Sequence, residues 1–151
     1  MEESQAKAMG DEILGTLTAY DYVGLEPSEI GLGPAFVIES VLRKAGLALS
    51  GIQLFEINEA FAAQVLASVE ALACKKFAAK FFPSGQPVGE INPALLNVNG
   101  GGIALGHPVG VTGARLILTC LMEMKRRGLQ RGLVSLCIGG GQGGAVILER
   151  N

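Results

Sequence analysis

Hydrophobic and polar positions follow two different periods along the first third of the chain. Residues 13–23 (ILGTLTAYDYV) alternate and are rich in β-branched and aromatic side chains, which predicts a strand. From Pro34 the apolar residues recur at helical spacing as far as Gly46, so a helix is expected there. The short apolar run at 52–57 then predicts a buried strand.

The rest of the chain continues this exchange of helical and strand-like patterns. It predicts helices at 58–77 and 108–127 and strands at 94–99, 132–138 and 144–150. Residues 75–93 show no clean period and are expected to be irregular. The order β-α-β-α-β-α-β-β predicts an α/β domain with a mostly parallel five-stranded sheet, helices on both faces and a final antiparallel hairpin.

Composition narrows the classes of protein that this pattern allows. The chain has 151 residues, 49% of them hydrophobic, which suits one domain, and its net charge of -2 argues against nucleic-acid binding. No apolar stretch reaches the roughly 20 residues of a membrane span, and nothing marks the chain for secretion, so a cytoplasmic location is expected. Three cysteines without a C-x-x-C pair suit a reducing compartment, and with His107 as the only histidine we expect no metal site.

Glycine is the compositional outlier, with 22 residues, and about half of them lie in three short stretches at 99–102, 106–113 and 139–144. Such clusters indicate places where the backbone closely approaches other backbone or a ligand. Gly139, Gly141 and Gly144 match the G-x-G-x-x-G dinucleotide pattern, but no helix follows them to place a dipole under a phosphate. The stretch therefore predicts either a tight hairpin or a loop that brings Cys137 close to a reactant.

Three polar side chains follow predicted strands, where function gathers in sheets of this kind. They are Asn58, His107 and Cys137, and all three could converge. Each also has a purely structural interpretation: Asn58 and His107 could cap helices, and Cys137 could be an inert buried thiol. With a reactive Cys137, the pair Cys137 and His107 would alternatively suit a small hydrolase. Cys74 and Cys120 are expected to be packing residues.

Longer motifs carry a resemblance to a known family. The segments NEAFAAQ (58–64), NVNGGGIALGHPVGVTGAR (97–115) and CIGGGQGG (137–144) resemble, in order and spacing, the three C-terminal signatures of the thiolases. GLGPA (31–35) and EMKRRG (123–128) are also similar to that family, so the resemblance covers nearly the whole chain. It implies a thiolase-like C-terminal domain at 13–151, preceded by an interdomain-type segment at 1–12.

The resemblance also implies roles for individual residues in acyl transfer to or from coenzyme A. It makes Asn58 and His107 stabilisers of the thioester oxyanion, Cys137 the acid/base at the α-carbon, and Gly139 a backbone donor of a second oxyanion hole. Ala60 and Phe61 would line the path of the acyl and pantetheine chain. The substrates would be coenzyme A thioesters of fatty acid metabolism, with no permanently bound cofactor.

One family feature is missing from the sequence. The thiolase nucleophile lies in a C-x-S-G context of the N-terminal domain, whereas Cys74, Cys120 and Cys137 are followed by KKF, LME and IGG. The chain is therefore expected to be inactive alone and to depend on an N-terminal thiolase domain. The alternatives are a truncated fragment or a non-catalytic thiolase-fold module that associates with another protein.

The helix predicted after His107 supports the expectation of a partner. Its apolar residues, from Val109 to Met124, lie on every side, with Arg115 the only charge before Glu123. A helix that is hydrophobic all round is normally buried on all sides. We therefore expect it to pack against an N-terminal domain or against a second copy of this chain.

Overall fold

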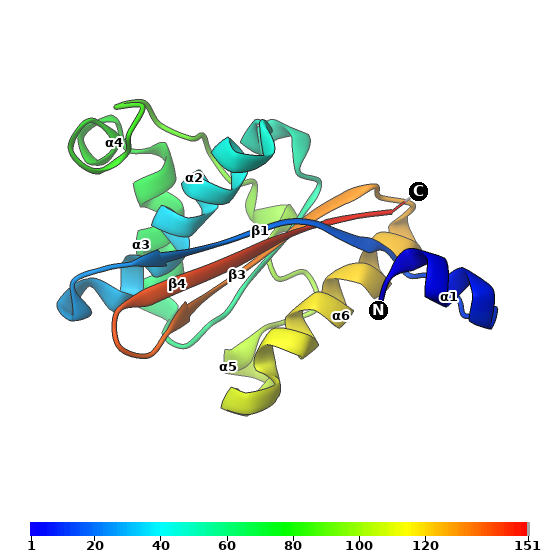
Figure 1. Ribbon diagram of the computed structural model, residues 1–151. Helices are drawn as coiled ribbons and strands as arrows, with labels where there is room; N and C mark the ends of the chain where they lie inside the picture. Colours follow the sequence, from blue (N-terminus) through cyan, green and yellow to red (C-terminus); the bar gives the residue numbers. More distant parts are fainter. Residues whose placement is uncertain (151) are drawn as a thin grey trace.

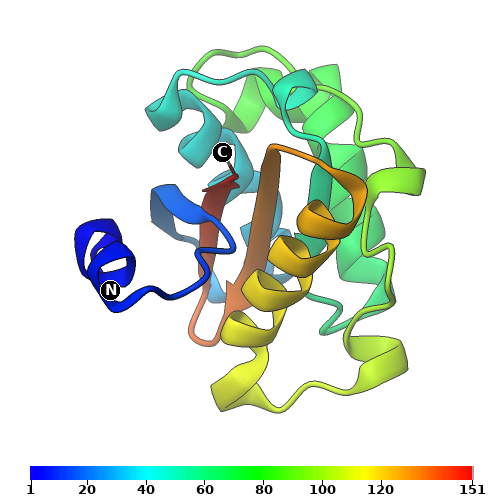
Figure 2. The ribbon, with the colours of Figure 1, turned by 90° about the vertical axis from the view of Figure 1, so that its right-hand side faces the viewer.

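The computed structural model describes residues 1–150. Its helices and strands, in chain order, are α1 (Glu3–Met9), β1 (Thr16–Gly24), α2 (Gly33–Ala45), β2 (Leu54–Ile57), α3 (Ala62–Ala73), α4 (Lys75–Phe81), α5 (Gly102–Leu105), α6 (Val109–Arg127), β3 (Arg131–Ile138) and β4 (Gln142–Glu149). The sheet has α2 and α3 on one face and α6 on the other (Figure 1), so the predicted α/β layering is confirmed. The helix α1 projects from the body of the domain, and a segment without helix or strand connects it to β1 (Figure 2).

The prediction of a mostly parallel five-stranded sheet is wrong. Within residues 1–150 the sheet has four strands in the order β1-β4-β3-β2, and only β2 and β3 pair in parallel. β4 lies between β1 and β3 and is antiparallel to both. The strands β1, β2 and β3 do point the same way, as their alternation with helices implied, but the last strand enters the middle of the sheet rather than its edge.

Residues 94–99, expected as the third of the five strands, form a single parallel bridge between Leu96 and Phe55. A turn at Pro93–Leu95 precedes the bridge, and Asn97 follows it with a left-handed φ of 47°. The Asn97 carboxamide then takes the place of a strand partner: Oδ1 accepts from the Ile57 N–H at 2.8 Å and Nδ2 donates to the Ile57 carbonyl at 2.9 Å. The Asn97 side chain therefore provides the hydrogen bonds that a fifth strand would give to the backbone of Ile57 in β2. The backbone after Asn97 turns away from the sheet.

The helix predicted at 58–77 is shorter and is followed by a second helix. Residues 58–61 are non-helical, with a bend at Ala60 and Phe61 extended, α3 begins at Ala62, and the chain bends at Cys74, whose ψ of 114° ends the helix. The next residues form α4, inside the segment expected to be irregular. Its helical period is hard to detect in the sequence because its apolar side is aromatic: Phe77 and Phe81 pack edge-on against Phe36 of α2, at centroid distances of 5.5 and 5.8 Å.

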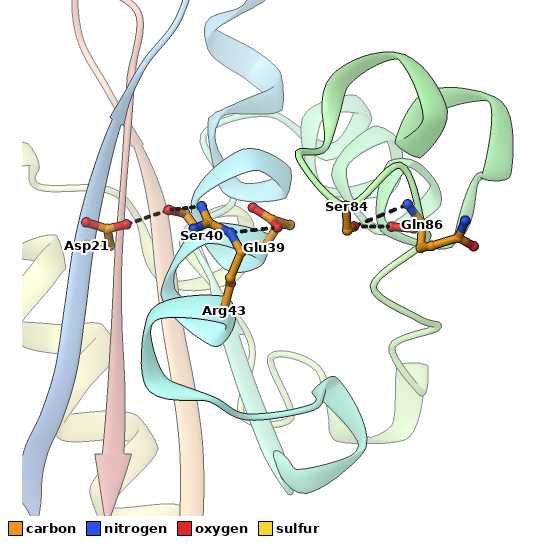
Figure 3. Close-up of polar contacts among 6 residues, drawn as sticks. All are labelled: Asp21, Glu39, Ser40, Arg43, Ser84 and Gln86. Atoms are coloured by element: carbon orange, nitrogen blue, oxygen red, sulfur yellow. Dashed lines mark hydrogen bonds and ion pairs between the residues drawn. The ribbon is translucent and has the colours of Figure 1, made fainter.

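Helix α2 is the element that most directly fits its sequence signals. Pro34 stands in its first turn, and Gly46 ends it with a left-handed φ of 66°. A close approach of backbone to backbone seats it on the sheet, because a Cβ on Gly143 of β4 would lie 2.5 Å from the Gly33 carbonyl oxygen. Ser40 donates to the Asp21 carboxylate of β1 at 2.5 Å, which adds a polar tie between helix and sheet edge (Figure 3).

Two apolar clusters fill the two faces of the sheet. The larger lies between the sheet and α2, α3 and α4, and includes Ile38, Leu72 and Ile147, all fully buried. The smaller lies under α6 and is built on Leu54, Leu116 and Met124. Burying such side chains contributes roughly 1.5–3 kcal/mol each, so the larger cluster supplies most of the apolar stabilisation.

Candidate active site

Asn58 lies at the carboxyl end of β2 and is fully buried. Its backbone N–H donates to the Ser135 carbonyl of β3 at 2.9 Å, which places Asn58 where the carboxyl ends of the parallel strands β2 and β3 lie side by side. Its side chain does not cap a helix, because α3 begins four residues later with Phe61 at the capping position. Instead Asn58 Nδ2 lies 3.4 Å from His107 Nε2, and Oδ1 has no hydrogen-bond partner in residues 1–150.

His107 precedes α6, and the contacts around it fit one tautomer of the neutral ring. The Thr112 hydroxyl donates its one proton to the Pro108 carbonyl at 3.1 Å. In this arrangement it accepts from the His107 Nδ1–H, and the two atoms lie 2.7 Å apart. Nε2 then carries the lone pair and accepts from Asn58 Nδ2. The ring presents a base to this edge of the sheet, and it does not cap the helix.

The loop that delivers His107 is bound to the end of β2 by Glu59. One carboxylate oxygen accepts from Asn97 Nδ2 and the other from the Ile103 N–H, both at 3.0 Å. Gly101 lies directly against this carboxylate, since a Cβ there would be 2.4 Å from the Glu59 carboxyl carbon. The glycine run at 99–102 thus allows close approach to a side chain.

Cys137 lies near the end of β3, half-buried, and the structure does not bond it to either of the other two side chains within residues 1–150. Its hydrogen-bond partner is Gln64 of α3, whose Oε1 lies 3.6 Å from the sulfur. Asn58 and Cys137 nevertheless lie at the same end of the sheet, because β2 and β3 are parallel neighbours and both residues lie at or near the carboxyl ends of these strands. The structure therefore shows the expected contact for Asn58 and His107, whereas Cys137 stands on the neighbouring strand β3 and contacts Gln64.

The glycine stretch after Cys137 is a hairpin turn between antiparallel β3 and β4, as the structural interpretation predicted. Gly140 and Gly141 have left-handed φ values of 86° and 85°. A strand follows directly where a nucleotide loop would need a helix, so the nucleotide interpretation fails. Gly139 is exposed at the start of this turn with open space around it. Its oxyanion role stays a prediction.

The other residues named from the sequence occupy clear positions. Ala60 is half-buried and Phe61 is 73% exposed, and both lie in the non-helical link between β2 and α3. Their role along an acyl path stays a prediction. Cys120 is fully buried, and burial, together with the charge of Glu56, raises the pKa of its thiol to about 12. This fits a packing residue. Cys74 is half-buried at the bend between α3 and α4.

Four residues that shape this site were missed by the sequence reasoning: Glu59, Gln64, Asn97 and Thr112. Two local signals could have pointed to them. Asn tolerates the left-handed conformation that Asn97 adopts before its glycines, and Thr112 stands four residues after Pro108, the spacing that brings a hydroxyl back to a helical carbonyl. Nothing local marks Gln64 as a neighbour of Cys137, 73 residues away.

Comparison with known proteins identifies the family. Residues 11–150 match the domain described as "Thiolase, C-terminal domain". The chain belongs to the thiolase family. It is 47% identical over 147 residues to peroxisomal 3-ketoacyl-CoA thiolase B of Rattus norvegicus, covering 97% of this chain and 31% of the rat protein. It is 43% identical to a 3-ketoacyl-CoA thiolase of Salmonella typhi, covering 99% of this chain and 34% of that protein.

Solved thiolase structures share the fold. Human mitochondrial 3-ketoacyl-CoA thiolase aligns with a TM-score of 0.84 at 38% identity, covering 99% of this chain and 34% of the human one, and the same enzyme is also known in complex with CoA with the same values. The chain thus spans about a third of the length of the thiolases it matches. Among its described residues, 1–150, no helix combines the length and the apolarity required to cross a membrane.

Proposed function

We propose that this chain is the C-terminal domain of a thiolase that transfers acyl groups to or from CoA, by thiolytic cleavage of a 3-ketoacyl-CoA or Claisen condensation of acetyl-CoA. The observation that carries the proposal is the contact between Asn58 Nδ2 and His107 Nε2 at the carboxyl end of β2, the strand next to the one that carries Cys137. The substrates are CoA thioesters, consistent with the CoA complex of the related human enzyme. No cofactor needs to stay bound.

The geometry supports distinct roles for the two side chains in contact. His107 Nε2 carries a lone pair, so it can take the proton of a nucleophilic thiol that attacks the thioester carbon. The resulting Nε2–H then donates, together with Asn58 Nδ2, to the negative oxygen that forms on that carbon. The proton returns to the leaving CoA thiolate as the acyl-enzyme forms.

Cys137 serves the second half-reaction in this proposal. As a thiolate it removes a proton from the α-carbon of the acetyl unit, and as a thiol it returns that proton in the reverse direction. The Gly139 N–H donates to the enolate oxygen, and Ala60 and Phe61 line the approach of the acyl and pantetheine chain. These assignments follow the resemblance of the motifs at 58–64, 97–115 and 137–144.

The nucleophile itself must come from an N-terminal half, because none of the three cysteines stands in a C-x-S-G context. The matched thiolases are about three times as long as this chain. We expect the isolated chain to show no thiolysis of acetoacetyl-CoA and to gain activity when the N-terminal half of a thiolase is supplied. Activity of the chain alone that Cys137→Ser abolishes would overturn this assignment.

Half-reactions of the complemented enzyme test the roles separately. Cys137→Ala should block condensation while acylation of the partner cysteine stays measurable, and His107→Ala should impair both steps. Cys74→Ala is the matched control, because Cys74 is half-buried at the bend between α3 and α4 and lies outside all three site motifs. Equal loss of acylation in the Cys137 and His107 variants would mean that the roles are wrongly assigned.

The outward side of α6 supports the need for a partner. Leu116 and Met124 are fully buried against the sheet, whereas Val111, Leu118 and Met122 are 50–55% exposed. The chain by itself therefore buries only the side of this helix that faces the sheet, and its outward side is left for the partner expected from the sequence. Covering about 300 Å² of such surface is worth on the order of 7 kcal/mol. In this proposal an N-terminal thiolase domain, or a second copy of the chain, packs there.

Sedimentation at micromolar concentration tests the covering of α6. We expect self-association or complex formation that Leu118→Lys weakens, because the charge would enter the contact. Leu66→Lys is the control, since Leu66 is 71% exposed on α3, on the opposite face of the sheet. A monomer without affinity for a hydrophobic dye would contradict the idea.

The cytoplasmic location stays a prediction, because relatives named peroxisomal match alongside the bacterial one.

A further inference from the structure

Gln64 combines deep burial with an unused hydrogen-bond donor. The residue is 7% exposed, its Oε1 accepts from the Cys137 thiol at 3.6 Å, and its Nε2 has no partner in residues 1–150. Leaving a buried donor unpaired costs about 1–3 kcal/mol. An apolar side chain of similar size would fill the same space without the free-energy cost of an unpaired donor. The unpaired donor therefore points to a second partner or a second state.

The surroundings of Gln64 restrict motion to its terminal amide. The backbone at this position lies in the first turn of α3, where the Gln64 N–H donates to the Phe61 carbonyl at 3.1 Å. Its aliphatic stem packs on Gly31, where a Cβ would lie 3.6 Å from the Gln64 Cγ. Gly31 is held in turn, because Ser68 one turn further along α3 donates to its carbonyl at 3.2 Å. The terminal amide can still rotate, since that torsion has two broad, nearly equivalent minima.

The two ends of the amide match the two protonation states of a cysteine. The thiol is a donor and pairs with Oε1, as the structure shows, whereas the thiolate is an acceptor and pairs with an Nε2–H after a half-turn of the amide. In either state one end of the amide binds sulfur and the other stays unpaired. The bond to the thiolate is the stronger one, because a charged acceptor roughly doubles the strength of a hydrogen bond.

We propose that Gln64 is a positioning residue that accompanies Cys137 through its proton cycle, with Oε1 toward the thiol and Nε2 toward the thiolate. The role of Cys137 as acid/base rests on the proposed function, whereas the pairing of amide and sulfur does not. The nearby carboxylates are either bonded to other groups or exposed, and Glu26, before the turn that precedes α2, is exposed. Glu59, after β2, is bonded to Asn97 and Ile103, and Glu29, in the turn before α2, is exposed. Across the hairpin Cys137 faces Gly143.

Alkylation of Cys137 by iodoacetamide between pH 6 and 10, read from the peptide mass, tests the pairing on the intact chain. Gln64→Glu keeps the shape but offers only acceptors and a negative charge, so the alkylation curve should move to higher pH and the rate at neutral pH should fall about tenfold or more. Gln64→Leu removes both partners and should move the curve in the same direction by less. Gln142→Glu, an exposed glutamine on β4 beside the same hairpin, should leave the rate within about twofold.

The ranking of these variants decides the proposal. A Gln64→Leu curve that coincides with the wild-type curve would show that Gln64 only fills space, and equal shifts in Gln64→Glu and Gln142→Glu would show a general charge effect; either overturns the inference. Unfolding midpoints in urea confirm that each variant is folded, and Gln64→Leu alone keeps the test valid if Gln64→Glu does not fold. In the complemented enzyme, Gln64→Leu should lower kcat for condensation without raising KM. An alkylation shift in an enzyme that never gains activity would refute the proposed function and leave the role of Gln64 standing.

Discussion

The two faces of the sheet differ in what they bury. On the side of α2 and α3 the interior is mainly apolar, with Ile38 and Ile147 fully covered, and its buried carboxylate, Glu39, is paired with Arg43. On the side of α6 the interior also holds ionisable groups: Glu56 is fully buried with both oxygens unpaired, and the guanidinium nitrogens of Arg115 are buried without a hydrogen bond in residues 1–150. The first face is a self-sufficient core. The second combines a small core with charges and an exposed apolar helix side, as expected of a surface that meets another domain.

The largest difference should appear in packing. Ile38→Ala removes a side chain that is fully covered under α2, so we expect the free energy of unfolding to fall by about 2–5 kcal/mol. Leu118→Ala, on the 54% exposed side of α6, should change it by less than about 0.5 kcal/mol. Urea unfolding of the isolated chain measures both. Similar losses in the two variants would mean that the outward side of α6 is already covered in the free chain.

Glu56, buried on the α6 side, should lower the free energy of unfolding of the chain as the pH rises. Burial raises the pKa of its carboxyl to about 7, and the nearby Arg115 only partly opposes this. The folded state therefore holds the proton more tightly than the unfolded state does, and stability falls as the pH rises from about 4.5 to about 7. Glu56→Gln should stabilise the chain at pH 8, by at most about 3 kcal/mol, and have little effect at pH 4.

Urea unfolding at the two pH values measures the Glu56 effect, with the exposed Glu70→Gln as the matched control. The control should show little change at either pH. A destabilised Glu56→Gln variant at pH 8 would show that Glu56 and Arg115 stabilise each other as an ion pair, and would contradict the prediction.

A smaller effect of opposite sign is expected at Glu123, near the other end of α6. Its side chain is 3% exposed, and hydrogen bonds from Arg126 first, then from Asn99 and Arg127, hold the pKa of its carboxyl at about 2. The stabilisation is present above about pH 4.5 and is lost as the pH falls toward 2. Because Arg126 is 65% exposed, water screens the pair, and Glu123→Gln should cost only about 1 kcal/mol at pH 6.

Acid unfolding followed by circular dichroism checks the Glu123 prediction. The wild-type and Glu123→Gln chains should converge in stability near pH 2, where the native carboxyl takes up its proton. Variants of Glu56 and Glu123 that respond to pH in the same direction would remove the electrostatic distinction between the two ends of α6.

Local signals in the sequence were sufficient for several elements. Pro34 and Gly46 mark the ends of α2 within a residue or two, and Gly128 with Lys125 and Arg126 marks the end of α6, because caps and helical period depend on neighbours a few residues away. The hairpin at 139–141 was equally readable from its glycines. The motifs around Asn58, His107 and Cys137 also identify the thiolase family from the sequence alone.

Tertiary structure alone decided the sheet order and the partners of each side chain in the site. β4 inserts between β1 and β3, and Asn97 replaces a fifth strand with its own carboxamide, because strand pairing depends on contacts between segments far apart in the chain. The same holds for His107 beside Asn58, 49 residues away, and for Gln64 beside Cys137, 73 residues away. Hydrophobic period and capping act over one or two turns, so they determine elements. Which elements meet, and which polar groups are left unpaired where they meet, depends on the packing of the whole domain.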